Sequence, residues 1–410
     1  MNLEIVTIGT ELLLGFTLDS NSAFAGRALA EFGVRVVRRT AVADEPGAIR
    51  AAVTEALART GAVITTGGLG PTRDDITKKV IADLFGVPLE FQEPLWQALI
   101  ERYHRYGRIP VESNRSQAEI PRGATVLRNQ WGSAPGIWLE GASGLVVMLP
   151  GVPREMENLL THEVVPRLLE RGGGRVIRSR LLRTAAIAES VLAERLGEIE
   201  REIAPLSLAY LPGVTGVDLR LTAWEMPSAE ADDRLGAAAD LIRARAGGHL
   251  FGEGETDLAA VLLDALRAAN VKLAVAESCT GGLLGGRITA IPGSSDVFLG
   301  GVIAYDNAVK TGMLGVAPEL IERHGAVSEE VARAMARGVR ERFGTEAAIS
   351  VTGIAGPSGG SEEKPIGTVW FAVSERNHEE AVRQMIFGDR EEIRARAAQW
   401  GLYLLWRRVV

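Results

Sequence analysis

The sequence predicts an α/β protein with three domains, in which two α/β domains flank a small α+β domain. The length of 410 residues exceeds what one hydrophobic core usually organises. In the first and last thirds, short apolar or β-branched runs alternate with amphipathic stretches, as in layered folds with mostly parallel strands. Gly, Asp and Asn gather where the expected strands end, and in such sheets ligands bind at the carboxyl ends of the strands.

Composition narrows the classes of protein to consider. A hydrophobic share of 46% and a charged share of 24% are average for soluble globular proteins and exclude disordered, collagen-like and membrane-embedded chains. A net charge of −7 disfavours a general nucleic-acid binder, so we expect no nucleic-acid and no membrane partner. The single cysteine, Cys279, forms no intrachain disulfide, and the first residues lack the pattern of a signal peptide. We therefore expect a cytoplasmic protein.

The N-terminal domain is expected over residues 1–170. Its strands are predicted at Leu3–Ile8, Val34–Thr40, Ala62–Thr66 and Gly144–Leu149, with helices between them. This alternation predicts three layers, with helices on both faces of a mostly parallel sheet. The Gly-rich stretch Arg171–Gly174 is the expected linker to the next domain.

The densest motif of this domain lies between the strand Ala62–Thr66 and a helix predicted at Ile76–Phe85. Glycines after a strand let backbone N–H groups approach an anion, and the helix N-terminus adds partial positive charge. The motif lacks the endings of a P-loop or a Rossmann turn. Paired aspartates suit a divalent cation such as Mg²⁺, although Asp75 alone could simply cap the helix. The predicted phosphate-binding residues are Gly67, Gly68, Gly70 and Thr72, and the predicted metal ligands are Asp74 and Asp75.

The middle domain is expected over residues 175–252 as a β-α-β-β-α unit. Its elements are predicted at Arg178–Thr184, Ala188–Glu202, Leu206–Pro212, Val217–Glu225 and Ala229–Ala246. The unit is too small for a catalytic cleft of its own. We interpret it as a spacer or dimerisation domain, which makes a homodimer the expected assembly.

The tetrapeptide Gly213-Val214-Thr215-Gly216 matches the GxxG of KH modules, which clamp a nucleic-acid backbone. Its place between two predicted strands favours a hairpin turn instead. Acidic residues balance the basic residues of this domain, which leaves no electrostatic footprint for nucleic acid.

The C-terminal domain is expected over residues 256–410, again with an α/β pattern. A helix begins near Thr256. Strands are predicted at Lys272–Ala276, Val297–Tyr305, Ala347–Val351 and Gly367–Val373, and a terminal helix begins near Arg390.

The run Ala276–Gly282 places a serine where a strand ends and a helix begins. A hydroxyl there lies next to backbone N–H groups, as an oxyanion hole or a phosphate site requires, so Thr280, Gly281 and Gly282 are the candidate donors. Ser278 is the candidate nucleophile and needs a base. With five histidines and no evident relay among them, Lys310 is the candidate base and Tyr305 the candidate proton relay.

Two further features of this domain bear on the site. Cys279 is the rival nucleophile, but without a histidine partner it resembles a small buried residue. A second glycine-rich loop follows the strand that ends at Val351. Its residues Thr352, Gly353 and Gly356 could bind a phosphate or a ribose opposite Ser278, and the alternative is a flexible connector.

The N-terminal loops resemble a known family. Gly9-Thr10-Glu11 with Asp19-Ser20-Asn21, the Gly/Asp motif, and Pro150–Glu155 together resemble the molybdopterin-binding domain family over about the first 165 residues. The resemblance implies a nucleotide or pterin site, with Glu11 and Asn21 near the ligand and Asp75 on the metal- and phosphate-handling aspartate. The segment Arg102–Gly136 is an insert relative to stand-alone molybdopterin adenylyltransferases.

The C-terminal motifs resemble the CinA C-terminal domain family, whose enzymatic members are nicotinamide-nucleotide amidohydrolases. The matching segments are Glu277–Gly282, Pro292–Ser295, Tyr305–Lys310, Gly325–Ser328, Gly353–Pro357 and Lys364–Val369. With the molybdopterin-binding-like and KH-like parts, the whole architecture is similar to the full-length bacterial CinA (competence/damage-inducible) family.

The resemblance implies two activities on small nucleotides. The C-terminal domain would convert nicotinamide mononucleotide to nicotinate mononucleotide and ammonia without a cofactor. The N-terminal domain would hydrolyse ADP-ribose to AMP and ribose 5-phosphate with a divalent metal ion. Two alternatives stay open: a non-catalytic regulatory or recombination-associated protein, and molybdopterin processing by the N-terminal domain.

Overall fold

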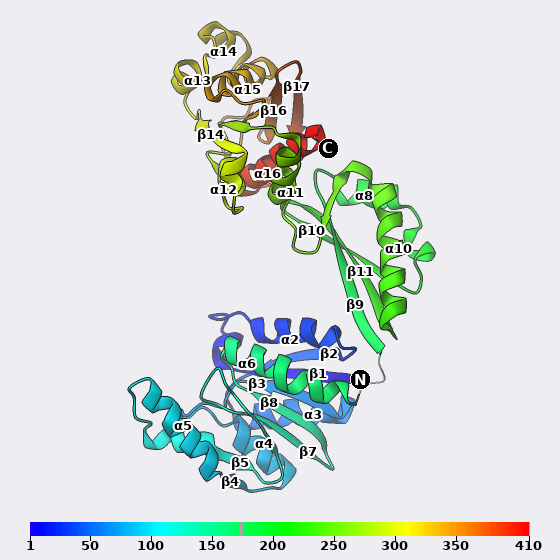
Figure 1. Ribbon diagram of the computed structural model, residues 1–410, viewed down its shortest axis with the longest axis vertical. Coiled ribbons are helices and arrows are strands. Elements are labelled where there is room, and N and C mark those ends of the chain that lie inside the picture. Colours follow the sequence, from blue (N-terminus) through cyan, green and yellow to red (C-terminus); the bar gives the residue numbers. More distant parts are fainter. Residues whose placement is uncertain (172–174, 410) are drawn as a thin grey trace. The chain divides into compact units, whose positions relative to one another are not determined.

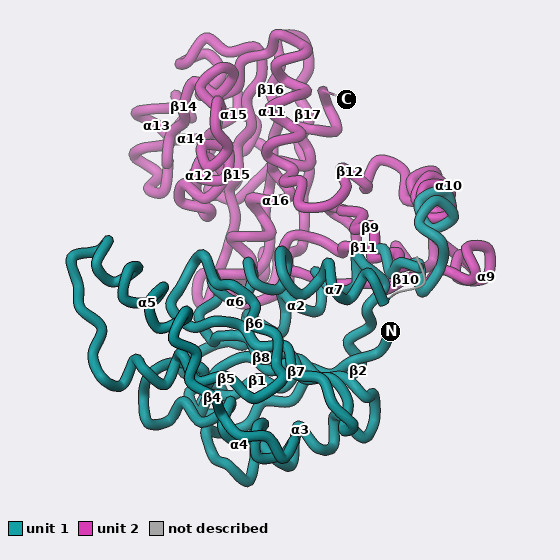
Figure 2. Tube along the Cα trace, turned by 60° about the horizontal axis from the view of Figure 1, so that its bottom comes forward, with its two compact units in different colours: residues 1–178, 223–233 teal, residues 179–222, 234–410 magenta. Residues whose placement is uncertain are grey.

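The computed structural model describes residues 1–171 and 175–409. The chain forms two compact units, one of residues 1–178 and 223–233 and the other of residues 179–222 and 234–410 (Figure 2). The predicted linker Arg171–Gly174 lies outside the described residues except for Arg171.

Residues 1–171 contain a six-stranded sheet with flanking helices (Figure 1). The strands of this sheet are β1 Asn2–Ile8, β2 Arg35–Val42, β3 Ala62–Thr66, β6 Thr125–Leu127, β7 Gly136–Gly141 and β8 Gly144–Leu149. Two further strands, β4 Leu89–Phe91 and β5 Glu119–Pro121, pair with each other in a separate two-stranded sheet. The helices are α1 Thr10–Leu13, α2 Ser20–Ala30, α3 Pro46–Thr60, α4 Thr77–Phe85, α5 Glu93–Arg105, α6 Pro153–Leu159 and α7 Val165–Leu169.

The strand order of this sheet is β2-β1-β3-β8-β7-β6. Strands β2, β1, β3 and β8 are parallel, whereas β7 and β6 are antiparallel additions. One face packs against α2 and α6 through Leu29 and Leu159, and the other packs against α3 and α4 through Ile49 and Ile81. Strand β3 is buried along its whole length because helices cover both faces. The predicted three-layer α/β fold is confirmed.

The middle region forms a four-stranded sheet in the order β10-β11-β9-β12. Its elements are β9 Arg175–Thr184, α8 Glu189–Leu196, α9 Ile199–Glu202, β10 Ser207–Gly213, β11 Gly216–Pro227, α10 Ser228–Ala246 and β12 Leu250–Glu253. Gly213 pairs with Gly216 across an antiparallel hairpin, which confirms the turn expected for that tetrapeptide. The single helix predicted over Ala188–Glu202 is wrong. Gly197, with φ of 61°, separates α8 from α9.

The C-terminal region contains a five-stranded sheet. Its strands are β13 Leu273–Glu277, β14 Phe298–Ile303, β15 Ala347–Gly353, β16 Thr368–Glu375 and β17 Glu379–Met385. Its helices are α11 Leu258–Ala269, α12 Leu283–Thr289, α13 Asn307–Leu314, α14 Pro318–His324, α15 Glu329–Phe343 and α16 Arg390–Val409.

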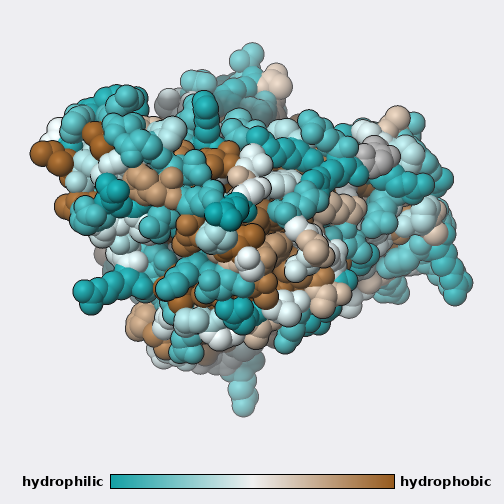
Figure 3. Space-filling model, turned by 90° about the horizontal axis from the view of Figure 1, so that it is seen from below, coloured by the Kyte–Doolittle hydropathy of each residue, from teal (hydrophilic) through white to brown (hydrophobic). Residues whose placement is uncertain are grey.

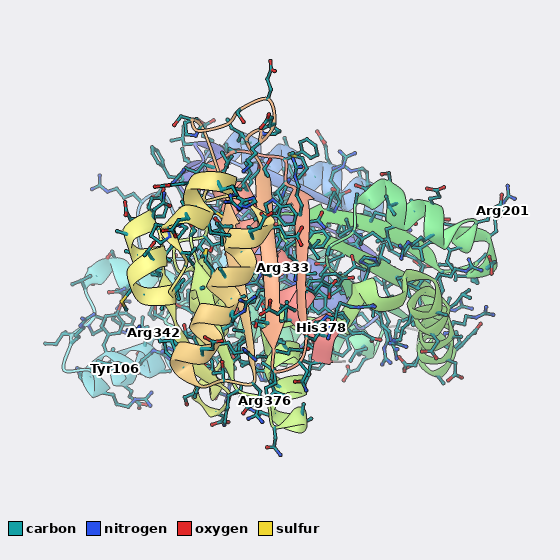
Figure 4. The ribbon with its side chains drawn as sticks, turned by 90° about the horizontal axis from the view of Figure 1, so that it is seen from above. Tyr106, Arg201, Arg333, Arg342, Arg376 and His378 are labelled. Atoms are coloured by element: carbon teal, nitrogen blue, oxygen red, sulfur yellow. The ribbon has the colours of Figure 1, made fainter. Side chains whose placement is uncertain are left out.

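The strand order of this sheet is β14-β13-β15-β16-β17, and β14, β13 and β15 are parallel. Helices α11, α12 and α16 pack on one face, and α15 packs on the other through Met335 and Val339. Helix α15 also contacts the edge strand β17. Arg337 donates from Nε and Nη2 to the Glu379 carboxylate, both at 2.8 Å, and Arg333 (Figure 4) donates to the Glu379 carbonyl at 3.0 Å.

The surface carries no broad apolar belt on the face shown in Figure 3, where apolar residues are interspersed with polar ones. Across residues 1–171 and 175–409, no helix combines the length and the apolar character needed to cross a membrane.

Candidate functional site

The loop between β13 and α12 is held by a buried carboxylate. Glu277, at the end of β13, is 1% exposed. Its carboxylate accepts hydrogen bonds from the backbone N–H groups of Gly282 at 2.9 Å, Leu284 at 3.1 Å and Gly285 at 2.8 Å. Gly282 has φ of 95°, which favours glycine there. An internal anion therefore satisfies the first amides of α12.

This arrangement changes which amides could serve a substrate. The Gly281 N–H donates to the Ser278 carbonyl at 3.1 Å, and the Gly282 N–H donates to Glu277. Of the three predicted donors, Thr280 is the one whose N–H reaches no oxygen of a described residue. Oxyanion stabilisation by Gly281 and Gly282 would require those bonds to break.

Ser278 is fixed by contacts on either side of the loop. Its N–H donates to the Val351 carbonyl of β15 at 2.9 Å, and Ser278 is 8% exposed. Arg394 of α16 donates to the carbonyls of Cys279 at 3.2 Å and Thr280 at 2.9 Å. The hydroxyl is thus presented from a rigid backbone.

A cavity of about 200 Å³ lies beside Ser278. It is lined by Ser278, Cys279, Tyr305, Asn307, Lys310, Ala326, Val327, Thr352, Gly353, Ala355 and Arg390. Five residues predicted from the sequence therefore meet here, because the parallel strands β13, β14 and β15 end at one edge of the sheet. Thr280, Gly281, Gly282 and Gly356 are near in sequence but do not line the cavity.

Lys310, on α13, is 1% exposed although it carries an amine. Its Nζ donates to the carbonyls of Ala304 at 2.9 Å and Tyr305 at 3.2 Å. Burial lowers the pKa of Lys310, and the nearby Asp306 carboxylate opposes this shift only in part. A lowered pKa raises the fraction of neutral amine near neutral pH, which a general base requires.

The structure disfavours Cys279 as a nucleophile. Burial raises the pKa of its thiol to about 12. The thiolate is the reactive form of cysteine, so at neutral pH this side chain stays protonated and inert.

Arg390 is a residue of the cavity that the sequence reasoning missed. Its Nη1 donates to the Gly356 carbonyl at 2.5 Å, and its Nη2 donates to the Tyr305 hydroxyl at 3.1 Å. Among the described residues it forms no ion pair, and no acidic residue lines the cavity. The Arg390 charge therefore makes this site attractive to an anion. Asn307 is a second cavity residue that was not predicted. It lies within Tyr305–Lys310, a segment that carries the family resemblance, and could have been predicted from it.

A second, smaller cavity lies at the strand ends of the N-terminal sheet. Its volume is about 100 Å³, and its lining residues are Thr7, Ile8, Glu11, Leu12, Thr17, Leu18, Asp19, Ser20, Asn21, Thr66, Gly151 and Pro153. Asn21 joins three loops, since its Nδ2 donates to Thr66 Oγ1 at 3.0 Å and to the Gly151 carbonyl at 2.8 Å. Its Oδ1 is buried and accepts no hydrogen bond from any described residue.

The Gly/Asp motif does not line this cavity, and its contacts are internal. A Cβ on Gly67 would lie 2.2 Å from the Ile8 carbonyl oxygen, and one on Gly68 would lie 2.0 Å from Thr77 Oγ1. Close packing therefore requires these glycines. Asp75 Oδ2 accepts from the Thr72 N–H at 2.8 Å and from the Thr72 hydroxyl. The alternative that Asp75 caps α4 is wrong, because that helix has no side-chain cap.

The fit of a divalent cation to this motif rests mainly on Asp74. In residues 1–171 and 175–409, no group of three or more His, Cys, Asp or Glu side chains could hold a metal. The Asp74 carboxylate is exposed, whereas Asp75 is already engaged by Thr72. Mg²⁺ commonly binds through one or two carboxylates plus substrate phosphates. The residues thus fit a cation that shares its coordination with a bound phosphate.

Comparison with known proteins follows the three regions of the fold. Residues 4–170 match the probable molybdopterin binding domain, residues 179–252 the damage-inducible protein CinA KH domain, and residues 255–409 the CinA C-terminal domain. A CinA-like protein from Gemmatimonas aurantiaca is 56% identical over 411 aligned positions, covering 99% of this chain and 96% of that protein. The chain belongs to the CinA family.

Other CinA relatives agree. A putative competence-damage inducible protein from Moorella thermoacetica is 44% identical, with 99% of this chain and 98% of that protein covered. Among solved structures, the competence/damage inducible protein CihA from Agrobacterium tumefaciens is 40% identical, with a TM-score of 0.35, and the match covers 36% of this chain and 91% of that chain. The matches to the three family domains and to the two full-length relatives confirm the resemblance inferred from the motifs.

Proposed function

We propose that the C-terminal domain hydrolyses the carboxamide of nicotinamide mononucleotide, giving nicotinate mononucleotide and ammonia. The observation that carries this proposal is the cavity that Ser278 and the buried Lys310 both line. A hydroxyl and a lysine of lowered pKa in one cavity are a combination suited to acyl-group chemistry.

In this proposal Lys310 is the base. Its neutral amine takes the proton from the Ser278 hydroxyl as the oxygen attacks the carboxamide carbon, or from a water molecule that Ser278 orients. Tyr305 relays a proton to the departing amide nitrogen, which leaves as ammonia. Water supplies the oxygen of the product carboxylate.

The charge of the cavity supports a nucleotide as the substrate. Ligand pockets usually span roughly 300–1,000 Å³, so a cavity of about 200 Å³ encloses just the reacting end of the molecule. The phosphate would then lie at the rim, where Arg390 carries a positive charge without an acidic partner among the described residues.

Ammonia release from nicotinamide mononucleotide by the purified chain tests this function. Nicotinamide serves as the second substrate and the Ser278→Ala protein as the control. We expect release that requires both the nucleotide and Ser278. Absence of release from correctly folded protein would refute the proposal and favour the non-catalytic regulatory alternative.

A second activity is proposed for the N-terminal domain: metal-dependent hydrolysis of ADP-ribose to AMP and ribose 5-phosphate. The buried Asn21 Oδ1 without a partner favours it, because such an acceptor suits a ligand hydroxyl or amino group. Asp74, and Asp75 if released from Thr72, would hold the cation that polarises the diphosphate. AMP formation with Mg²⁺ that is lost in Asn21→Ala tests this. Pterin binding without response to ADP-ribose would favour molybdopterin processing instead.

A further inference from the structure

Two loops of the C-terminal domain meet beside the cavity of the proposed deamidase. One is the segment Gly325–Val327 between α14 and α15, which we call the cavity wall because Ala326 and Val327 line the cavity. The other is the glycine-rich loop of residues 354–367 between β15 and β16. Lys364 of the glycine-rich loop lies where the two meet, and the mechanism proposed above does not use it.

Lys364 joins the two loops through a backbone carbonyl. Its Nζ donates at 2.6 Å to the carbonyl of His324, the last residue of α14. The approach is close, since a Cβ on Gly325 would lie 3.2 Å from that Nζ, and Gly325 has φ of 76°, which also favours glycine. Lys364 is half-buried and forms no ion pair within the described part of the chain. Its charge is therefore directed at the cavity wall.

The next two carbonyls of the cavity wall are also held by side chains. Ser328 Oγ donates to the Gly325 carbonyl at 2.9 Å, and Thr352 Oγ1 donates to the Ala326 carbonyl at 2.9 Å. With the Lys364 bond, three successive carbonyls accept from three different side chains. Lys364 is the charged donor of the three, and hydrogen bonds from a charged donor are the stronger ones. The position of the wall therefore depends on the lysine.

The glycine-rich loop gives Lys364 a fixed base. The Ser361 N–H donates to the Lys364 carbonyl at 3.0 Å, and the Lys364 N–H donates to Ser361 Oγ at 3.1 Å. Nearer the start of the loop, Arg390 donates to the Gly356 carbonyl. The lysine thus extends from a turn that is closed by its own hydrogen bonds. Its bond to His324 couples the position of the loop to the position of the wall.

We propose that Lys364 is a positioning residue for the reaction in this cavity. Its ammonium holds the cavity wall at the distance from Ser278 at which the carboxamide fits between them. Lys364 does not line the cavity, so it acts through Ala326 and Val327 and does not touch the substrate. The inference rests on the proposed deamidation for its substrate. A displacement of roughly 1 Å in a reacting site can slow an enzyme about 100-fold, so a wall held in place has kinetic value.

Steady-state kinetics of Lys364→Met with nicotinamide mononucleotide test the proposal. The variant keeps a long side chain and removes the ammonium. We expect kcat to fall at least about ten-fold, because the carboxamide is no longer held against Ser278. KM should change less than about three-fold, because the phosphate contact proposed for Arg390 is untouched. Lys364→Arg, whose guanidinium can donate to the same carbonyl, should restore kcat to within about three-fold of the native value.

Lys272→Met is the matched control. The Lys272 Nζ also donates to a backbone carbonyl of this domain, that of Asp296. Lys272 directly precedes β13, at the end of the strand away from Ser278, and does not line the cavity. Its loss should leave kcat within about two-fold of the native value. An unchanged kcat in Lys364→Met, an equal fall in both methionine variants, or an effect on KM alone would overturn the positioning role.

Amide hydrogen exchange separates this inference from the proposed function, since it needs no substrate. The N–H groups of Gly325 and Val331 are hydrogen-bonded on either side of the cavity wall. In Lys364→Met both should exchange at least about ten-fold faster than in the native chain, because the wall opens more often, and Lys272→Met should leave them unchanged. Unchanged exchange in Lys364→Met would overturn the positioning role, whereas a native chain that releases no ammonia would refute the deamidase proposal alone.

Discussion

Arg390 provides the most informative test of the C-terminal site. The guanidinium has five N–H donors. One goes to the Gly356 carbonyl and one to the Tyr305 hydroxyl, which leaves three for a ligand. Three donors are enough for the paired contact that arginine makes with a phosphate. Arg390→Gln removes the charge and the paired donors while keeping a side chain of similar length.

The expected effect follows from the energy of a hydrogen bond to a charged group, about 1.5–3 kcal/mol. Its loss should lower kcat/KM for nicotinamide mononucleotide by roughly 10- to 150-fold, at about 1.4 kcal/mol per factor of ten. Arg390→Lys keeps the charge but not the planar fork, so it should restore part of the loss.

The assay is ammonia release from the nucleotide and from the corresponding nucleoside, which lacks the phosphate. If Arg390 binds the phosphate, Arg390→Gln should affect the nucleotide far more than the nucleoside. An equal loss on both substrates would refute this reasoning. It would show that Arg390 acts through its bonds to Tyr305 and Gly356 alone.

Three other predictions concern individual side chains. Ser278→Ala and Lys310→Ala should each lower ammonia release by at least about 100-fold while circular dichroism shows a folded chain; unchanged turnover would remove that residue from the mechanism. Cys279→Ala should keep activity within about three-fold, and the native thiol should resist alkylation at pH 7, because its pKa is raised to about 12; rapid alkylation would contradict this. Burial lowers the pKa of Lys78 from 10.5 to about 8, so between these values the unfolded chain binds more protons and stability rises with pH, by about 3 kcal/mol in total. Denaturant unfolding at pH 7 and pH 10 should show a larger rise in the native chain than in Lys78→Met, because other groups titrate equally in both; equal pH dependence in both would contradict the prediction.

Much of the site could be predicted because it depends on local sequence. Ser278 and Tyr305 follow apolar strands and Thr352 lies near the end of one, and parallel strands bring their carboxyl ends together whatever the rest of the chain does. Lys310 lies on the first turn of α13, the helix after β14. Predicting these residues requires no knowledge of how distant parts of the chain pack.

The missed features depend on contacts between distant residues. Arg390 reaches Tyr305 across 85 positions, and that contact exists because α16 packs beside the strand ends. Strand β17 is polar, since it lies at the sheet edge, so it lacks the apolar run that identifies a buried strand. The glycines at 67 and 68 stay a predicted phosphate site, and their close neighbours Ile8 and Thr77 give a separate packing reason for glycine there. A glycine needed for close packing and a glycine needed for the approach of a phosphate look the same in the sequence.

The carboxylate of Glu277 has a consequence for the direction in which a substrate enters. A free helix N-terminus beside Ser278 would attract a phosphate and would leave the carboxamide at the rim, away from the hydroxyl. Glu277 already occupies that position with its own negative charge and three hydrogen bonds. Arg390 is an exposed cationic side chain of the cavity, without an acidic partner among the described residues. For the proposed nucleotide substrate, this arrangement favours entry of the amide first, with the phosphate left at Arg390.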